Sequence, residues 1–174
     1  IGENLKIRRF AQVEESNGFI ASYIHMGGKI GVLVDVETDV VNSAIEEMAK
    51  NVAMQAAALK PMYTNRSEVD PEYIAKETEI ITATAKNEKP DANDKIIEGM
   101  VKGRLNKELK EICLLDQTYV KAEDGKQSVS AYVAEVAKAN NANITIKGFV
   151  RFETGEGIEK KNEDFAAEVA AQLQ

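Results

Sequence analysis

The sequence predicts an α+β fold: a small three-stranded antiparallel sheet packed by helices, with an inserted antiparallel coiled-coil helical hairpin. Three observations support this class. Two β-branched and aromatic runs flank the Gly27-Gly28 dipeptide, and a third such run lies near the C-terminus. The segments between the second and third runs have the 3.6-residue apolar spacing of amphipathic helices. Strands that pair without an alternating βα order indicate α+β rather than α/β.

The first strands are predicted from alternation and from the glycine turn. Residues 1–14 alternate apolar with charged side chains, which is the period of a half-buried strand. Residues 18–26 and 29–37 are predicted to form the two arms of a β-hairpin. Glycines at positions 27 and 28 favour this turn because they adopt positive φ angles without a Cβ clash.

Helices are predicted in the middle of the chain. An amphipathic helix is expected over residues 39–61, followed by a helix that begins at Asp70-Pro71, where aspartate caps the first turn. Residues 87–93 break that helix, and a second one follows with apolar positions over 96–105. Both helices have narrow apolar stripes that can be buried only against each other. We therefore expect a coiled-coil hairpin that projects from the globular part.

The last part of the chain returns to the sheet. A short helix is expected from Ser128 to Asn140-Asn141, and a third strand over residues 144–153, with a phase slip at Gly148 that indicates a bulge. The predicted organisation is a first part of the core subdomain (1–69), the coiled-coil insertion (70–108), a second part of the core subdomain (109–160) and a C-terminal helix (161–174).

Composition excludes several classes of function. The 174 residues contain 22 Lys and Arg against 29 Asp and Glu, a net charge of −7, so direct nucleic-acid binding through a positive field is not expected. The pair Arg8-Arg9 is interpreted as part of a solvated face. No apolar run is long enough to span a membrane. One cysteine and one histidine provide neither a disulfide nor a four-ligand zinc site, which favours the cytoplasm and makes Cys113 a small core residue.

Catalysis is also not predicted. The only histidine, His25, lies in the hairpin with no serine or cysteine nucleophile beside it in the sequence. Two interpretations of His25 remain open, a strand-end histidine or a contact with a partner. The Gly27–Gly31 run lacks the spacing of a phosphate-binding loop and precedes a strand, so no cofactor is expected. The residues thus predict a non-catalytic module, either a protein-binding domain or a structural coiled-coil adaptor.

Several segments resemble, in order and spacing, the translation elongation factor Ts family. Together they extend over essentially the whole chain. They are Ile-Gly-Glu-Asn-Leu-Lys-Ile-Arg-Arg (1–9), Ser-Tyr-Ile-His-Met-Gly-Gly-Lys-Ile-Gly-Val-Leu-Val (22–34), Asn-Val-Ala-Met-Gln-Ala-Ala-Ala (51–58), Lys-Gly-Arg-Leu-Asn-Lys (102–107) with Asp-Gln-Thr-Tyr-Val (116–120), and residues 148–160 with 164–169.

The resemblance implies both a fold and a partner. The family's core has two related halves, each with a small antiparallel sheet, and a coiled coil inserted in the second half. The chain matches that second half, the coiled coil and the final helix, so we expect it to be a piece of a longer factor. The implied partner is elongation factor Tu, GDP-bound or nucleotide-free, and the implied activity is guanine-nucleotide exchange, which needs no covalent chemistry and no cofactor.

The resemblance also suggests site residues. Ile1, Gly2 and His25 match family positions that touch the GTP-binding domain of the partner, whereas Gln55, where many members have histidine, is given no functional role. The family's Thr-Asp-Phe-Val motif, which acts beside the partner's magnesium ion, has no counterpart here, because Thr38-Asp39-Val40 opens a helix instead. Weak exchange by this chain alone is therefore expected. Self-association through the coiled coil, as a dimerisation or adaptor module, is the alternative.

Overall fold

The computed structural model describes residues 7–158, and it confirms the α+β class and the three-stranded antiparallel sheet. The final helix predicted over 161–174 lies outside the described residues. The helices and strands, in chain order, are β1 (Gly18–His25), β2 (Ile30–Thr38), α1 (Ser43–Leu59), α2 (Pro71–Glu88), α3 (Asp94–Ile112), α4 (Val129–Ala139) and β3 (Ile144–Glu153). Short 3-10 turns occur at Met26–Gly28, Arg66–Glu68 and Leu114–Asp116.

The sheet has the order β1-β2-β3 with both pairs antiparallel, so β2 is the central strand. The predicted hairpin is present, and its turn has positive φ at Gly27 (65°) and Gly28 (96°). The predicted bulge is present as well. Asp35 pairs with Gly148 and the next residue, Val36, pairs with Ile146, which leaves Lys147 as the extra residue on β3.

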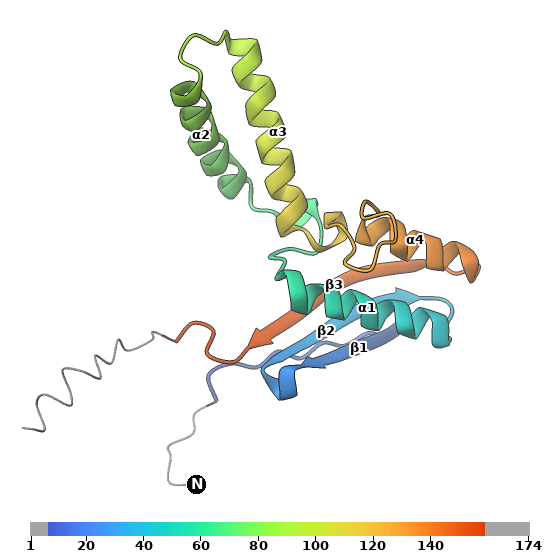
Figure 1. Cartoon of the computed structure of the whole chain (residues 1–174). Coiled ribbons are helices and arrows are strands. Elements are labelled where there is room, and N and C mark those ends of the chain that lie inside the picture. The colour runs from blue at the N-terminus through green and yellow to red at the C-terminus, as the bar shows by residue number, and fades with distance from the viewer. Residues whose placement is uncertain (1–6, 159–174) are drawn as a thin grey trace, which may run out of the picture.

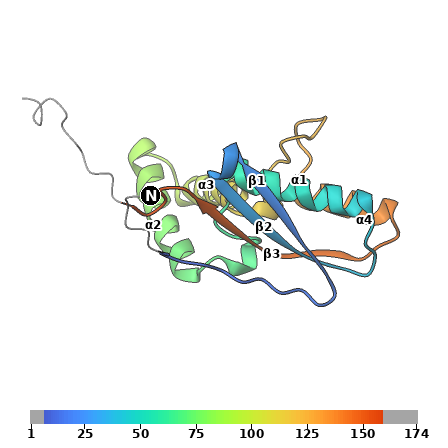
Figure 2. The same cartoon turned by 90° about the horizontal axis from the view of Figure 1, so that it is seen from below.

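Helices α1 and α4 lie on one face of the sheet (Figure 1). Along β2, every second residue from Ile30 to Thr38 is buried beneath these helices, which is the period of a strand with one covered face. Ile45 and Met48 of α1 are fully buried against that face. Figure 2 shows the opposite face, which no described helix covers.

The coiled-coil hairpin projects from the sheet domain (Figure 1). Asp70 caps α2 by accepting a hydrogen bond from the Glu72 backbone N–H, as the Asp70-Pro71 signal predicts. The two helices are linked near the base by the Tyr73 hydroxyl, which donates to Glu108, and near the tip by an Arg104–Glu88 ion pair. Helix α3 runs without a break to Ile112, beyond the boundary predicted at residue 108.

The prediction of a strand over residues 1–14 is wrong for residues 7–14, because residues 7–17 form no strand. The alternating pattern is present, but no strand pairs with it, and Ile7 and Phe10 are 90% and 83% exposed. The segment runs beside the sheet from the end of β3 to the start of β1 (Figure 2). Charged side chains tether it, including an ion pair between Glu15 and Lys147 of β3 with an N–O distance of 3.9 Å.

Candidate partner-binding site

His25 is the last residue of β1 and lies at the tip of the hairpin, where it pairs with Ile30 across the turn. Its side chain is exposed. Tyr23, two residues earlier on the same side of the strand, has its hydroxyl 2.9 Å from His25 Nδ1. The two rings also stack, with centroids 5.7 Å apart and planes 28° from parallel. The imidazole is thus exposed and held in one orientation, as a contact residue would be.

An apolar pocket of about 450 Å³ lies beside His25. It is formed where the hairpin tip meets the C-terminal end of α1 and the segment around Val120. Met26 is 61% exposed at its edge, and Val120 is 47% exposed. Its other lining residues are Tyr23, Ile30, Met54, Ala57, Ala58, Lys60, Lys121 and Glu153. Exposed apolar side chains gathered around one polar ring are typical of a protein-contact surface.

Gln55 supports one wall of this pocket. Its side chain is fully buried in α1, and its Nε2 donates to Gln117 Oε1 at 3.1 Å and to the Thr118 carbonyl oxygen at 3.0 Å. Its Oε1 accepts from the Val120 backbone N–H at 2.9 Å. Gln55, which the sequence analysis left without a role, therefore holds segment 117–120 against α1. The only sequence signal for this role is a polar residue within an alanine-rich helix.

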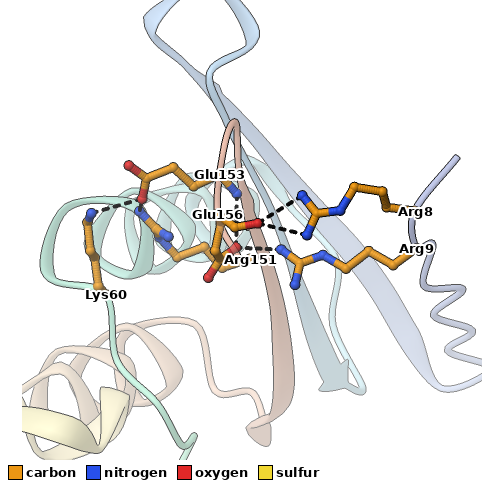
Figure 3. Close-up of polar contacts among 6 residues, drawn as sticks. All are labelled: Arg8, Arg9, Lys60, Arg151, Glu153 and Glu156. Carbon is orange, nitrogen blue, oxygen red and sulfur yellow. Dashed lines mark hydrogen bonds and ion pairs between the residues drawn. The ribbon is translucent and has the colours of Figure 1, made fainter. Parts of the chain in front are cut away.

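A network of charged side chains lies at the same end of the sheet (Figure 3). Glu153 Oε2 accepts from Lys60 Nζ at 2.8 Å and from Arg151 Nη2 at 2.7 Å. These hydrogen bonds, that of Lys60 first, lower the pKa of Glu153. The network joins the C-terminal cap of α1 to the last residues of β3.

The second half of the network ties the N-terminal segment to the turn after β3 (Figure 3). Both Nη atoms of Arg8 donate to the Glu156 carbonyl oxygen at 3.0 Å, and Arg9 pairs with the Glu156 carboxylate at 2.5 Å. The hydrogen bond from Arg9 lowers the pKa of Glu156. Arg9 also lies 4.5 Å above the Phe152 ring centroid. Arg8 and Arg9 are both exposed, as the interpretation of a solvated face predicts, and they also tie this segment to Glu156.

The described residues offer little for covalent chemistry. Cys113 is buried, as expected of a core residue, and burial raises the pKa of its thiol. No group of three or more His, Cys, Asp or Glu side chains within residues 7–158 is placed to hold a metal ion. In the same range, no helix combines the length and the apolar character needed to cross a bilayer. Of the three predicted contact residues, His25 is placed by the structure, whereas Ile1 and Gly2 lie outside the described residues.

Comparison with known proteins gives one consistent result. A family model described as "Elongation factor TS" matches residues 1–156. The chain is 57% identical over 173 residues to elongation factor Ts of Clostridioides difficile strain 630, covering 99% of this chain and 55% of the relative. It is 49% identical over 174 residues to elongation factor Ts of Clostridium botulinum strain Eklund 17B, covering 99% and 56%.

A third relative, elongation factor Ts of Clostridium acetobutylicum, is 47% identical over 175 residues, covering 100% of this chain and 56% of the relative. The chain thus spans about half the length of the curated relatives it matches. The family match extends through the hairpin, the coiled coil, β3 and the charged network. The chain therefore belongs to the elongation factor Ts family, whose members are translation factors.

Proposed function

We propose that this chain binds elongation factor Tu in its GDP-bound and nucleotide-free forms, through a surface that includes His25. We also propose that it contributes to guanine-nucleotide exchange by the full-length factor during protein synthesis in the cytoplasm. Family membership supports the choice of partner. The proposed site rests on one observation. His25 is exposed, its ring contacts the Tyr23 hydroxyl, and it lies beside an apolar pocket. Ile1 and Gly2 complete the proposed contact set.

The exchange activity follows from linkage and needs no reacting group on this chain. A protein that binds the nucleotide-free form of its partner more tightly than the GDP form must weaken GDP binding by the same factor. The exposed His25 and the apolar pocket beside it support a role in protein binding of this kind. In this sense the protein is an exchange factor and not an enzyme that makes or breaks covalent bonds.

The proposal is tested by capture of the chain on immobilised elongation factor Tu, either loaded with GDP or stripped of nucleotide. We expect retention on both forms, with more on the stripped form. Stopped-flow release of a fluorescent GDP analogue should show only slight acceleration, because these 174 residues contain no Thr-Asp-Phe-Val motif. No retention on either form would contradict the proposed binding. Acceleration as large as that by a full-length factor would show that the motif is dispensable.

The His25→Ala variant should bind elongation factor Tu about fivefold more weakly, because it loses one polar contact worth roughly 1 kcal/mol. Ser22→Ala is the matched control, since Ser22 is exposed on the same strand but does not line the pocket. Isothermal titration calorimetry with nucleotide-free partner measures both. Equal dissociation constants for the two variants would favour the interpretation of His25 as a strand-end residue only.

Self-association is a second candidate function, favoured by the surface of the coiled coil. Ile80 on α2 and Ile96 on α3 remain 57% and 47% exposed after the two helices have packed together. A dimer formed through these residues would bury them. Sedimentation over a range of protein concentrations, with and without elongation factor Tu, separates the two candidates. Self-pairing increases the sedimenting mass with concentration alone, whereas hetero-association requires the partner.

A further inference from the structure

Tyr23 contacts the imidazole of His25 in two ways. Its hydroxyl lies 2.9 Å from His25 Nδ1, and its ring stacks on the imidazole with a centroid distance of 5.7 Å. The two residues are two positions apart on β1, so both side chains leave the same face of the strand. Both also line the apolar pocket at the hairpin tip. The contact therefore determines which edge of the imidazole faces Tyr23 and which edge faces away.

The hydroxyl contact also bears on where the imidazole carries its proton. A neutral imidazole has one N–H donor and one bare nitrogen acceptor, and the hydrogen bond made by one nitrogen sets the role of the other. A phenol is a good donor and a weak acceptor, because its lone pair is delocalised into the ring. This asymmetry favours the arrangement in which the Tyr23 hydroxyl donates and His25 Nδ1 accepts. The proton of the neutral ring then lies on Nε2.

His25 Nε2 is the atom left for a partner. The His25 side chain is exposed, and within residues 7–158 its hydrogen bond is made through Nδ1 and not through Nε2. An exposed N–H held in one direction recognises a hydrogen-bond acceptor and disfavours a donor, because two donors that meet are both left unpaired. A partner surface that covers the exposed Met26 and Val120 at the edge of the pocket would also remove water from around this hydrogen bond.

We infer that Tyr23 is a positioning residue of the partner-binding site. It holds His25 as the tautomer with its proton on Nε2, and this N–H donates to an acceptor oxygen of the partner, a carbonyl or a carboxylate. The recognition step rests on the proposed binding of elongation factor Tu through His25. The tautomer, in contrast, is a property of the free chain, so it is tested without any partner.

The tautomer is measured by nuclear magnetic resonance on the chain labelled with ¹⁵N-histidine, at about pH 8, where an ordinary imidazole is neutral. His25 is the only histidine, so its side-chain signals need no further assignment. The bare and the protonated nitrogen of one tautomer have widely separated ¹⁵N shifts, and exchange between tautomers draws these shifts together. We expect the native chain to carry the proton on Nε2. In Tyr23→Phe, which keeps the ring and removes the hydroxyl, the two shifts should move toward each other.

Tyr63→Phe is the matched control, because it removes a hydroxyl from a tyrosine that does not line the pocket. Its histidine spectrum should equal that of the native chain. A native spectrum with the proton on Nδ1, or with the two nitrogen shifts already averaged, would overturn the inference. A Tyr23→Phe spectrum identical to the native one would overturn it as well.

Calorimetry with nucleotide-free elongation factor Tu at about pH 8 tests the recognition step. Tyr23→Phe should weaken binding about twofold to threefold, because only part of the imidazole population then has the required tautomer and orientation. The same substitution should have no effect in the His25→Ala background, since a positioning residue acts only through the group that it positions. An equal loss in both backgrounds would show that Tyr23 contacts the partner itself, and it would overturn the positioning role.

Two replacements of His25 distinguish its two nitrogens. The amide nitrogen of glutamine reaches about as far along the side chain as Nε2, whereas that of asparagine reaches only about as far as Nδ1. His25→Gln should therefore bind within about twofold of the native chain, and His25→Asn about fivefold more weakly, like His25→Ala. Equal affinities of the two variants would overturn Nε2 as the contact atom. Failure of the native chain to bind the partner would contradict the proposed function, while the histidine spectrum would still decide whether Tyr23 sets the tautomer.

Discussion

The Gln55→Leu variant should lose about 2–4 kcal/mol of unfolding free energy, although leucine fills a similar volume. The substitution removes both hydrogen bonds donated by Gln55 Nε2 and the one accepted by its Oε1. Leucine offers no replacement, so the Thr118 carbonyl and the Val120 N–H are left without their partner in a partly buried region. Each buried polar group left unpaired costs roughly 1–3 kcal/mol.

Urea denaturation followed by circular dichroism measures this loss as a shift of the midpoint at constant slope. Gln12→Leu is the control, because the Gln12 side chain is exposed and its one hydrogen bond goes to the neighbouring Glu14. That variant should stay within about 0.5 kcal/mol of the native chain. A loss below about 1 kcal/mol for Gln55→Leu would mean that segment 117–120 finds other partners and is not held by this side chain.

The sheet could be predicted because its signals are local. The alternation along β2 records which face is buried, and Gly27-Gly28 specifies a turn that few other residues allow. The phase slip at Gly148 likewise records the bulge in β3. In each case the physical cause, a strand period or a positive φ angle, acts within a few residues. Such local causes produce sequence patterns that can be interpreted without knowledge of the tertiary structure.

The N-terminal segment shows the limit of that reasoning. Residues 7–14 carry an alternating pattern, but a strand forms only where another strand offers its backbone hydrogen-bonding groups. Nothing in the local sequence says whether such a strand is present. In the structure the segment is instead tethered through Arg8 and Arg9 to Glu156, almost 150 positions along the chain. Long-range ion pairs of this kind have no periodic signal.

The candidate site could be predicted only in part for the same reason. His25 is a candidate because it is the sole histidine, and its place at the hairpin tip follows from the Gly27-Gly28 turn. The pocket beside it could not be predicted, because four segments far apart in the sequence meet there. Gln55 and Arg151 are ordinary polar residues until packing buries them. Their importance depends on their neighbours rather than on their own identity.

The Leu114→Ala variant should lose about 2–5 kcal/mol of unfolding free energy, the range for removing a large apolar side chain from a close-packed core. Leu114 is fully buried at the junction between the coiled coil and the sheet domain. Its backbone N–H donates to the Tyr63 carbonyl at 2.9 Å, and the N–H of Leu115 donates to the Thr64 carbonyl at 3.0 Å. The side chain therefore anchors the segment through which α3 returns to the core.

Leu59→Ala removes the same atoms from a side chain that is 46% exposed at the end of α1, and it should cost less than half as much. Urea denaturation compares the two variants, with circular dichroism reporting all helices and tyrosine fluorescence reporting mainly the sheet domain, because Tyr73 is the one tyrosine of five that lies on the coiled coil. If the junction couples the two parts, both signals should shift together in Leu114→Ala. A circular dichroism transition with a second, later step that the fluorescence lacks would show that the coiled coil is held by its own contacts, such as Tyr73–Glu108 and Arg104–Glu88, and not through Leu114.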